Sequence, residues 1–250
     1  MNLKGKVVVV TGGARDIGRQ ISLMLTSLGA RVGINYFDNP EDAEITLKMV
    51  KEAGGEAIIV QGDMTRQEDA ERLMAETVKA FDNRIDGLVN VAGGLVARKT
   101  IEEMDVEFWD FLMDVNAKTA FLATKAAVSH MTGGGSVVNF ASQAARDGGG
   151  PGASAYAAAK GAVMTFTRSM AKELGPRGIR VNALCPGMIS TSFHDRFTLN
   201  TVRANVAAVT PLRREGSPDE IANLVAFLIS DDSSFITGTN LDINGGLLFS

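Results

Sequence analysis

A tyrosine and a lysine stand four residues apart in the stretch Ser154–Lys160, and their types and spacing could carry acid–base chemistry. Residues at this spacing share one face of a helix, and the intervening residues Ala157–Ala159 are strong helix formers. A free tyrosine titrates near pH ~10, and an adjacent ammonium favours the phenolate and lowers that pKa. Tyr156 and Lys160 are therefore a candidate general acid–base pair. The alternative is an ordinary surface pair without a chemical role, and the secondary-structure elements around Tyr156 and Lys160 distinguish the two interpretations.

A glycine-rich turn follows the first apolar run of the chain. Lys6–Val10 is predicted as a strand buried on both faces, and Thr11–Gly18 leads from it into a helix that ends at Gly29. Ala30–Tyr36 is predicted as the next strand. Glycines in such a turn let main-chain N–H groups approach a pyrophosphate at the helix N-terminus. The unit predicts a dinucleotide site, with a simple tight turn as the alternative.

Strands and helices alternate along the rest of the chain, which predicts a parallel sheet with helices on both faces. Further strands are expected at Glu56–Gln61, Gly87–Val91, Ser136–Ala141, Arg180–Leu184 and Asn240–Ile243. Further helices are expected at Glu41–Ala53, Arg66–Ala80, Val106–Met131, Ala155–Leu174 and Pro218–Ser230, with a helix-rich stretch at about Thr191–Ala208. The expected fold class is α/β, with residues 1–250 forming one Rossmann-type doubly wound domain around seven parallel strands. Ligands of such sheets lie beyond the carboxyl ends of the strands.

Composition narrows the function classes. The 250 residues are 45% hydrophobic and carry a net charge of −4 without a basic run, so nucleic acid and membrane surfaces are not expected partners. The single cysteine, Cys185, permits no intramolecular disulfide, and no secretory leader or long apolar span is seen, so a cytoplasmic location is expected. His130, His194 and Cys185 do not make a metal site.

The ordered motifs together resemble the classical short-chain dehydrogenase/reductase family over nearly the whole chain. The matching pieces are Thr11-Gly12…Ile17-Gly18, Asp63, Asn90-Val91-Ala92-Gly93, Asn116, Ser142, Tyr156…Lys160 and Pro186–Thr191. The closest similarity is to 3-oxoacyl-carrier-protein reductases, through Pro211–Arg214 and the tail Ile236–Gly246. The resemblance implies hydride transfer between a nicotinamide and a ketone or secondary alcohol, with a 3-oxoacyl thioester or a small carbonyl compound as substrate. An NAD-dependent sugar or polyol dehydrogenase and a non-catalytic nucleotide-binding scaffold are the alternatives.

The resemblance also implies roles for individual residues. Tyr156 would exchange a proton with the substrate oxygen, and Lys160 would lower the tyrosine's pKa and hold the nicotinamide ribose. Ser142 would hydrogen-bond the carbonyl oxygen where charge develops, and Asn116 would hold a water in a proton relay to Lys160. A strand-end cap and a locally satisfied buried amide are the alternatives for Ser142 and Asn116. The residues expected to meet the cofactor are Gly12, Arg15, Asp16, Ile17, Gly18, Tyr36, Asp63, Met64, Asn90, Ala92, Gly93, Tyr156, Lys160, Pro186, Gly187, Ile189 and Thr191.

Two positions bear on how the cofactor is held. Asp16 stands where the family usually has glycine, and we expect it to cap the helix that starts at Ile17 rather than to repel the pyrophosphate. NAD enzymes place an acid at the end of the second strand, whereas this chain has Tyr36 there, with Asp38 two residues on. Arg15 can meet a 2′-phosphate, so NADP(H) is favoured, and Asp38 leaves NAD(H) open.

The substrate region is expected at residues 143–155 and 188–214. The first stretch holds the glycine-rich run Gly148–Gly152, a flexible wall beside Tyr156. The second stretch carries apolar side chains suited to a mobile lid, namely Met188, Phe193, Phe197 and Leu199. Ordinary core packing or subunit contact explains these apolar residues equally well.

Macromolecular partners are suggested by the resemblance alone. Carrier-protein reductases use two arginines to dock an acidic carrier; Arg177 matches one, but Ser129–Gly135 offers neither lysine nor arginine for the other. The missing arginine weakens the case for an acyl-carrier protein. The family usually forms a homotetramer, for which Val106–Met131 and Ala155–Leu174 would supply a four-helix interface and the C-terminal segment a further contact. Alanines along both helices permit close packing, although packing within one subunit explains them equally well.

Overall fold

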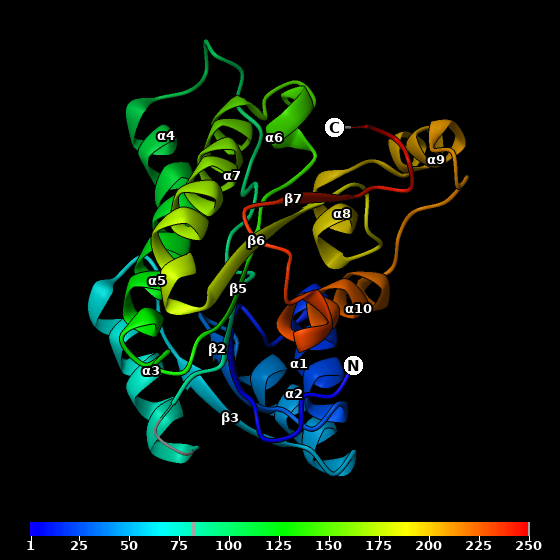
Figure 1. Cartoon of the computed structure of the whole chain (residues 1–250). Coiled ribbons are helices and arrows are strands. Elements are labelled where there is room, and N and C mark those ends of the chain that lie inside the picture. Colours follow the sequence, from blue (N-terminus) through cyan, green and yellow to red (C-terminus); the bar gives the residue numbers. More distant parts are fainter. Residues whose placement is uncertain (82–83, 250) are drawn as a thin grey trace.

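One parallel sheet organises the chain. The computed structural model describes residues 1–81 and 84–249, without the side chains of Phe193, His194 and Arg196 (Figure 1). Its seven strands run in the order β3-β2-β1-β4-β5-β6-β7, which confirms the predicted α/β fold class. Their bounds are β1 Val7–Thr11, β2 Arg31–Tyr36, β3 Glu56–Gln61, β4 Gly87–Asn90, β5 Gly135–Phe140, β6 Ile179–Pro186 and β7 Asn240–Ile243.

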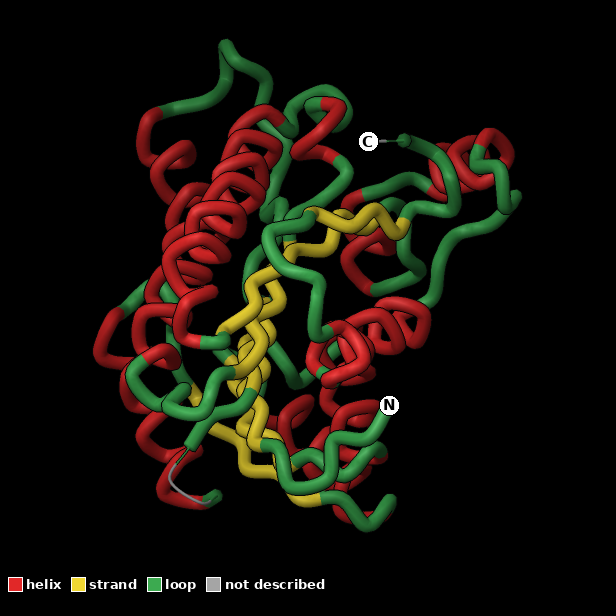
Figure 2. The backbone as a smooth tube through the Cα atoms, viewed as in Figure 1, coloured by secondary structure: helices red, strands yellow, loops and turns green. Residues whose placement is uncertain are grey.

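Helices cover both faces of this sheet, as Figure 2 shows. One layer holds α1 (Asp16–Ser27), α2 (Pro40–Glu52) and α10 (Pro218–Ile229); the other holds α3 (Gln67–Ala80), α5 (Thr119–Val128) and α7 (Ser154–Leu174). Strand β1 shows why both layers are needed. Successive side chains of a strand point to opposite faces, so Val8 and Val10 join the core under α1 and α10, while Val9 joins the core under α3 and α5.

The sheet places a crevice between β1 and β4. From β1 the chain winds outward to β2 and β3 and then crosses back to β4 on the other side of β1. In register, Thr11 at the end of β1 lies opposite Asn90 at the end of β4. The loops that leave these two carboxyl ends diverge to opposite faces, which is where doubly wound folds bind their ligands.

The predicted helix Val106–Met131 is interrupted. It consists of α4 (Val106–Met113), a π-helical turn η1 (Asp114–Lys118) and α5. Asn116 lies in the π turn, and its Nδ2 donates to the Leu112 carbonyl at 3.0 Å and to the Gly94 carbonyl at 2.9 Å. Insertion of a polar side chain into the helical hydrogen-bond ladder is a recognised cause of such a turn.

Short elements build the rim of the crevice. They are α6 (Ala144–Asp147), α8 (Ser192–Phe197) and α9 (Asn200–Val209), with one-turn 3₁₀ helices η2 (Gly175–Arg177) and η3 (Asp231–Ser233) elsewhere. The predicted helix-rich stretch at Thr191–Ala208 is thus present as two helices, α8 and α9, beside the end of β7 (Figure 1). Across the two described ranges, no helix has the length and apolar character needed to cross a bilayer.

Candidate cofactor and catalytic site

Three of the residues expected to be catalytic converge beyond the end of β5. Ser142 follows that strand by two residues, and Tyr156 and Lys160 lie on the first turns of α7. The Ser142 hydroxyl and the Tyr156 phenol are hydrogen-bonded. The Lys160 ammonium lies 5.8 Å from the centre of the Tyr156 ring, as expected for residues one helical turn apart. The structure therefore brings the three side chains to one point.

The charges of this group are set by burial. Lys160 is 4% exposed, and its Nζ donates to the Phe140 carbonyl at 2.7 Å. Burial lowers the pKa of Lys160 to about 8. Burial also raises the pKa of Tyr156, and the hydrogen bond with Ser142 only partly opposes that rise. The net pKa of Tyr156 is thus raised, so any lowering by Lys160 does not outweigh the effect of burial.

Asn116 holds the loop after β4 against Lys160. Its Oδ1 accepts from the Gly94 N–H at 2.9 Å, and both Nδ2 hydrogens are used by the Gly94 and Leu112 carbonyls. A Cβ on Gly93 would lie 2.7 Å from Asn116 Oδ1 and 3.3 Å from Lys160 Nζ, so only glycine fits there. Asn116 thus lies next to the lysine, with its amide committed to main-chain groups.

The glycine turn has the geometry of an anion cradle. Gly12 has a φ of 61°, and a Cβ there would lie 3.2 Å from the main chain of Ala92. A Cβ on Gly18 would lie 2.0 Å from the Gly12 carbonyl oxygen, so α1 can approach the turn only with glycine there. Arg15 precedes α1 without making a side-chain cap. The first N–H groups of α1 are therefore available to an anion, and the turn fits a dinucleotide pyrophosphate.

Asn35 is a positioning residue that sequence reasoning missed. It is 2% exposed, and its Oδ1 accepts from the Gly12 N–H at 3.1 Å while its Nδ2 donates to the Gly62 carbonyl at 3.0 Å. One side chain thus fixes the glycine turn to the end of β3. The available signal was an amide in a strand that is otherwise buried and apolar at Val32–Ile34.

Asp63 and Asn90, two of the residues expected to meet the cofactor, differ in where their side chains point. Asp63 follows β3, and its Oδ1 accepts from the Thr65 N–H and hydroxyl at 2.9 and 2.7 Å. Asn90 is 4% exposed and donates to Asn139 Oδ1 at 2.8 Å and to Thr124 Oγ1 at 3.2 Å. The Asn90 side chain therefore faces the helices that cover the sheet, and Asp63 keeps its place beside the crevice.

Comparison with known proteins decides the family. A family model described as Enoyl-(Acyl carrier protein) reductase matches residues 12–248. A 3-oxoacyl-[acyl-carrier-protein] reductase from Synechocystis is 36% identical over 250 residues, covering 98% of each chain. The chain belongs to the short-chain dehydrogenase/reductase family. This family uses NAD(P)(H) and acts on small molecules.

Solved structures of similar proteins agree with this assignment. A short-chain dehydrogenase/reductase from Serratia marcescens superposes with a TM-score of 0.93 at 32% identity, covering 99% of each chain. The NADH-dependent reductase A1-R′, responsible for alginate metabolism, superposes with a TM-score of 0.90 at 34% identity, again over 99% of each chain. The predicted membership of the family is therefore confirmed.

In this short-chain dehydrogenase/reductase the segment after β6 closes the other side of the crevice. Ile189 and Thr191 are 4% and 8% exposed, and the Thr191 hydroxyl donates to the Ile189 carbonyl at 3.1 Å. A Cβ on Gly187 would lie 2.9 Å from Asn244 Cα, so glycine is needed for the chain to leave Pro186 at this angle. The remaining residues expected at the cofactor also follow strand ends or open α1, namely Ile17, Tyr36 and Met64.

Asp16 does not cap α1, contrary to the expectation from sequence. The helix begins at Asp16 itself, with Arg15 in the preceding position and no side-chain cap bond. Asp16 has a φ of 47°, which turns its carboxylate away from the first turn of α1. Its oxygens instead accept from the main-chain N–H of Ser192 at 3.0 Å and from the Ser192 hydroxyl at 2.5 Å. Asp16 therefore joins the glycine turn to the start of α8.

Proposed function

We propose that this protein is an NADP(H)-dependent carbonyl reductase or alcohol dehydrogenase of the short-chain type. The observation that carries the proposal is the meeting of Ser142, Tyr156 and Lys160 at the carboxyl end of β5, next to the glycine turn. A hydrogen-bonded serine–tyrosine pair beside a buried lysine is an acid–base group, and the turn fits a dinucleotide. A cytoplasmic location belongs to the same proposal, because the lone Cys185 allows no disulfide.

Each of the three side chains has a defined task in this reaction. A nicotinamide held beside these residues would supply a hydride to the carbonyl carbon in reduction, or accept one in alcohol oxidation. Tyr156 donates its proton to the carbonyl oxygen, and the raised pKa of Tyr156 keeps that proton in place at neutral pH. The Ser142 hydroxyl donates to the same oxygen as negative charge develops. Lys160, buried beside them, provides a positive charge that stabilises the phenolate.

The preference for NADP(H) rests on residues of this chain. Arg15 is exposed at the glycine turn and makes no ion pair with any residue in the described ranges. The end of β2 carries Tyr36, which is uncharged and therefore does not repel a 2′-phosphate. Asp38, two residues on, is exposed. The solved relative A1-R′ is NADH-dependent by name, so initial rates with NADPH and NADH are the direct test, and a tenfold preference for NADH would overturn this part.

The substrate is proposed to bind between residues 143–155 and 188–214. Within the first stretch α6 is tied to β7, because Arg146 pairs with Asp242 at 2.6 Å and donates to the Asn240 carbonyl. The second stretch contains α8 and α9, and Phe193 of the expected apolar lid lies outside the described side chains. A small free carbonyl compound suits this arrangement. A carrier-bound thioester is the second candidate, because Arg177 is exposed and, among the residues that the structure describes, bonds only the Val128 carbonyl, at 2.8 Å.

Cofactor oxidation with a panel of ketones, 3-oxoacyl thioesters and oxidised sugars tests the reaction. We expect NADPH-dependent reduction of at least one class, with loss of turnover in Tyr156→Phe and unchanged NADPH binding. Ser27→Ala, at an exposed residue at the end of α1, is the control and keeps its rate. An enzyme that binds NADPH but reduces nothing in a broad panel would favour a non-catalytic scaffold. Activity only with NAD and polyols would favour the sugar dehydrogenase.

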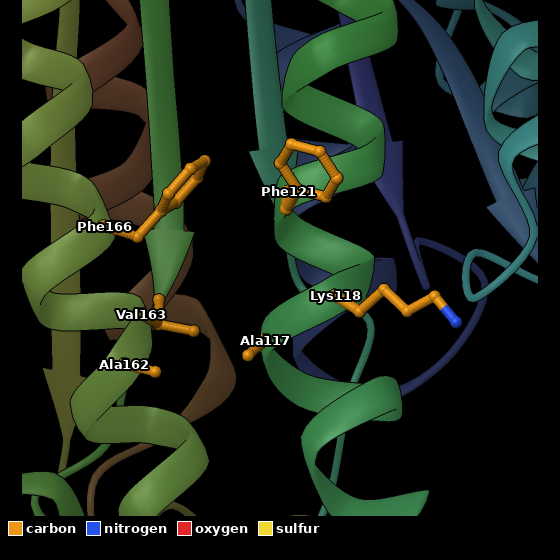
Figure 3. Close-up of a pocket in the computed structure, with 6 residues that line it drawn as sticks. All are labelled: Ala117, Lys118, Phe121, Ala162, Val163 and Phe166. Carbon is orange, nitrogen blue, oxygen red and sulfur yellow. The ribbon is translucent and has the colours of Figure 1, made fainter. Parts of the chain in front are cut away.

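We also propose a homotetramer assembled through α5 and α7. A groove of about 290 Å³ runs between these helices, and its lining is almost entirely apolar. Figure 3 shows Phe121 and Phe166 flanking the groove, Ala117, Ala162 and Val163 facing it, and Lys118 pointing away. The rings of Phe121 and Phe166 meet edge to face at 6.4 Å. The alanines Ala120, Ala123 and Ala127 are buried within the subunit, so the exposed phenylalanine rather than these alanines supports an interface.

A further inference from the structure

We infer that Asp16 is a positioning residue that fastens the substrate-side segment Ser192–Val209 to the cofactor turn and releases it when the dinucleotide binds. We call this segment, which contains α8 and α9, the lid. Asp16 lies on the glycine turn, and Ser192 is the first residue of the lid, 176 residues further along the chain. The inference builds on the proposed dinucleotide site, but the contact itself belongs to the chain alone.

The contact is specific in both partners. One carboxylate oxygen of Asp16 accepts from the main-chain N–H of Ser192, and the other accepts from its hydroxyl. The N–H of Ser192 opens α8, so it has no acceptor within that helix. An ionised acceptor at a helix N-terminus makes a strong, charge-assisted bond. Asp16 therefore caps α8 from across the crevice instead of capping its own helix.

The backbone of Asp16 is adapted to this contact. Its φ of 47° lies in the left-handed region, which costs energy for any residue with a Cβ. Aspartate tolerates that region better than most residues. Glycine would adopt it without strain but would offer no carboxylate to Ser192. The side chain is thus present at a conformational cost that the two hydrogen bonds offset.

The contact at Ser192 can position the whole lid, because Arg203 holds the lid together. Arg203, on α9, bonds Glu215 through Nε and Nη2 at 2.6 Å each and pairs with Asp195 on α8. Arg203 also donates to the Ser190 hydroxyl at 3.3 Å. One guanidinium thus joins α8, α9 and the segment before Ser217. Docking of the lid's first residue therefore sets the position of the rest.

The dinucleotide competes with this contact. Its pyrophosphate would lie at the N-terminus of α1, which begins at Asp16. The Asp16 carboxylate and the pyrophosphate are both anions, so they repel each other in that space. They also seek the same kind of donor, and the Ser192 N–H and hydroxyl stand within hydrogen-bond distance of the carboxylate. Binding of the cofactor is therefore coupled to undocking of the lid's first turn, and the carboxylate lowers cofactor affinity.

Hydrogen exchange of the lid amides in the cofactor-free enzyme tests the docking contact. Asp16→Gly removes the carboxylate and relieves the backbone, and we expect the α8 amides to exchange roughly tenfold faster, as for loss of one charge-assisted bond. Ser192→Ala removes only the hydroxyl bond, so its α8 amides should exchange at a rate between those of the wild type and Asp16→Gly. Val96→Gly, which relieves a similar left-handed residue with a φ of 61° in the loop after β4, is the control and leaves lid exchange unchanged. Equal lid exchange in wild type and Asp16→Gly would overturn the inference, whatever the cofactor does.

Cofactor affinity tests the competition and separates it from structural damage. Asp16→Asn keeps an acceptor oxygen for Ser192 and tolerates the left-handed backbone, but lacks the charge. We expect it to dock the lid nearly as wild type and to bind NADPH roughly three- to tenfold tighter. Asp16→Gly should also bind NADPH more tightly, and its excess lid exchange should vanish at saturating NADPH, where its substrate KM should equal that of the wild type. Weaker NADPH binding in both variants, or excess exchange that persists with NADPH, would refute the coupling; a failure of NADPH to bind wild type would refute the proposed function instead.

Discussion

The buried ammonium of Lys160 has a role in the proposed reaction but lowers the stability of the folded protein. The Lys160 ammonium is buried with one carbonyl acceptor, and burial lowers its pKa from 10.5 to about 8. A methylene chain of this length would pack in the same space without a charge. In the proposed reaction this charge stabilises the phenolate of Tyr156 when the proton leaves.

Replacing Lys160 by methionine should therefore stabilise the protein and abolish turnover. Below pH 8 the folded enzyme must bury the charge, whereas the unfolded chain keeps it in water, so the full cost applies at pH 7. A lowering of the pKa to about 8 corresponds to roughly 3 kcal/mol as an upper value. Between pH 8 and 10.5 the folded state loses its proton first, so the wild type gains stability relative to Lys160→Met. Urea unfolding of both proteins at pH 7 and 10 measures this, and a difference that is independent of pH would contradict it.

Arg15 should decide between the two nicotinamide cofactors. A guanidinium–phosphate contact at an accessible site contributes roughly 1–3 kcal/mol, so Arg15→Ala should raise the KM for NADPH about tenfold or more. The KM for NADH, which lacks the 2′-phosphate, should change little. Arg177→Ala, an exposed arginine on η2, serves as the matched control. A parallel rise of both KM values in Arg15→Ala would show that the arginine does not meet the 2′-phosphate.

Among the elements, the π turn η1 connects the helix layer to the loop beside Lys160. Its extra residue turns Asn116 toward the loop after β4. There the Asn116 side chain accepts from the Gly94 N–H and donates to the Gly94 carbonyl. A regular α-helix through Asp114–Lys118 would direct that position elsewhere by part of a turn. The π turn thus places the Asn116 amide beside Gly94, which a regular α-helix would not do.

Asn116→Ala tests this role of the π turn. The Gly94 N–H would lose a buried acceptor, and an unsatisfied buried group costs about 1–3 kcal/mol. We expect a loss of stability of that size together with a large fall in kcat, because the Gly93 loop would no longer be fixed beside Lys160. Chemical unfolding and steady-state kinetics measure both. Asn200→Ala, exposed at the start of α9, should change neither by a comparable amount, and equal effects in the two variants would count against the assignment.

Sequence patterns predicted elements and motifs better than they predicted how side chains are used. The seven strands were predictable because buried parallel strands are continuous apolar runs, as in Val7–Val10. The π turn was not, because Asp114–Lys118 has no proline or glycine to mark a break in the helix. The Asp16–Ser192 contact joins residues 176 positions apart, and local rules see only the helix that follows Asp16. The capping rules correctly predicted that the Asp16 carboxylate accepts a hydrogen bond at a helix N-terminus, but the helix is α8 and not α1.

At the scale of the molecule, the apolar face of α5 and α7 is the surface on which assembly should depend. Phe121 is 44% exposed there, and the groove beside it is open. Phe121→Glu and Phe166→Glu should place charges in that interface and yield smaller assemblies with the fold intact. Light scattering coupled to gel filtration, with circular dichroism, measures both. Phe235→Glu, at a fully exposed phenylalanine elsewhere, is the control, and a wild-type mass for all three variants would contradict the proposed interface.

The order of the strands also determines how long β1 waits for its second neighbouring strand during synthesis. Strand β1 can pair with β2 soon after it is made, but its other neighbour is β4, and the Val7 N–H bonds Asp86, 79 residues later in the chain. At a translation rate of roughly 5–20 residues per second, this edge waits at least about 4–16 s for its partner. During that interval an apolar, β-branched strand edge is open to other chains. Yield on expression should therefore depend on how quickly the segment that ends at β4 leaves the ribosome.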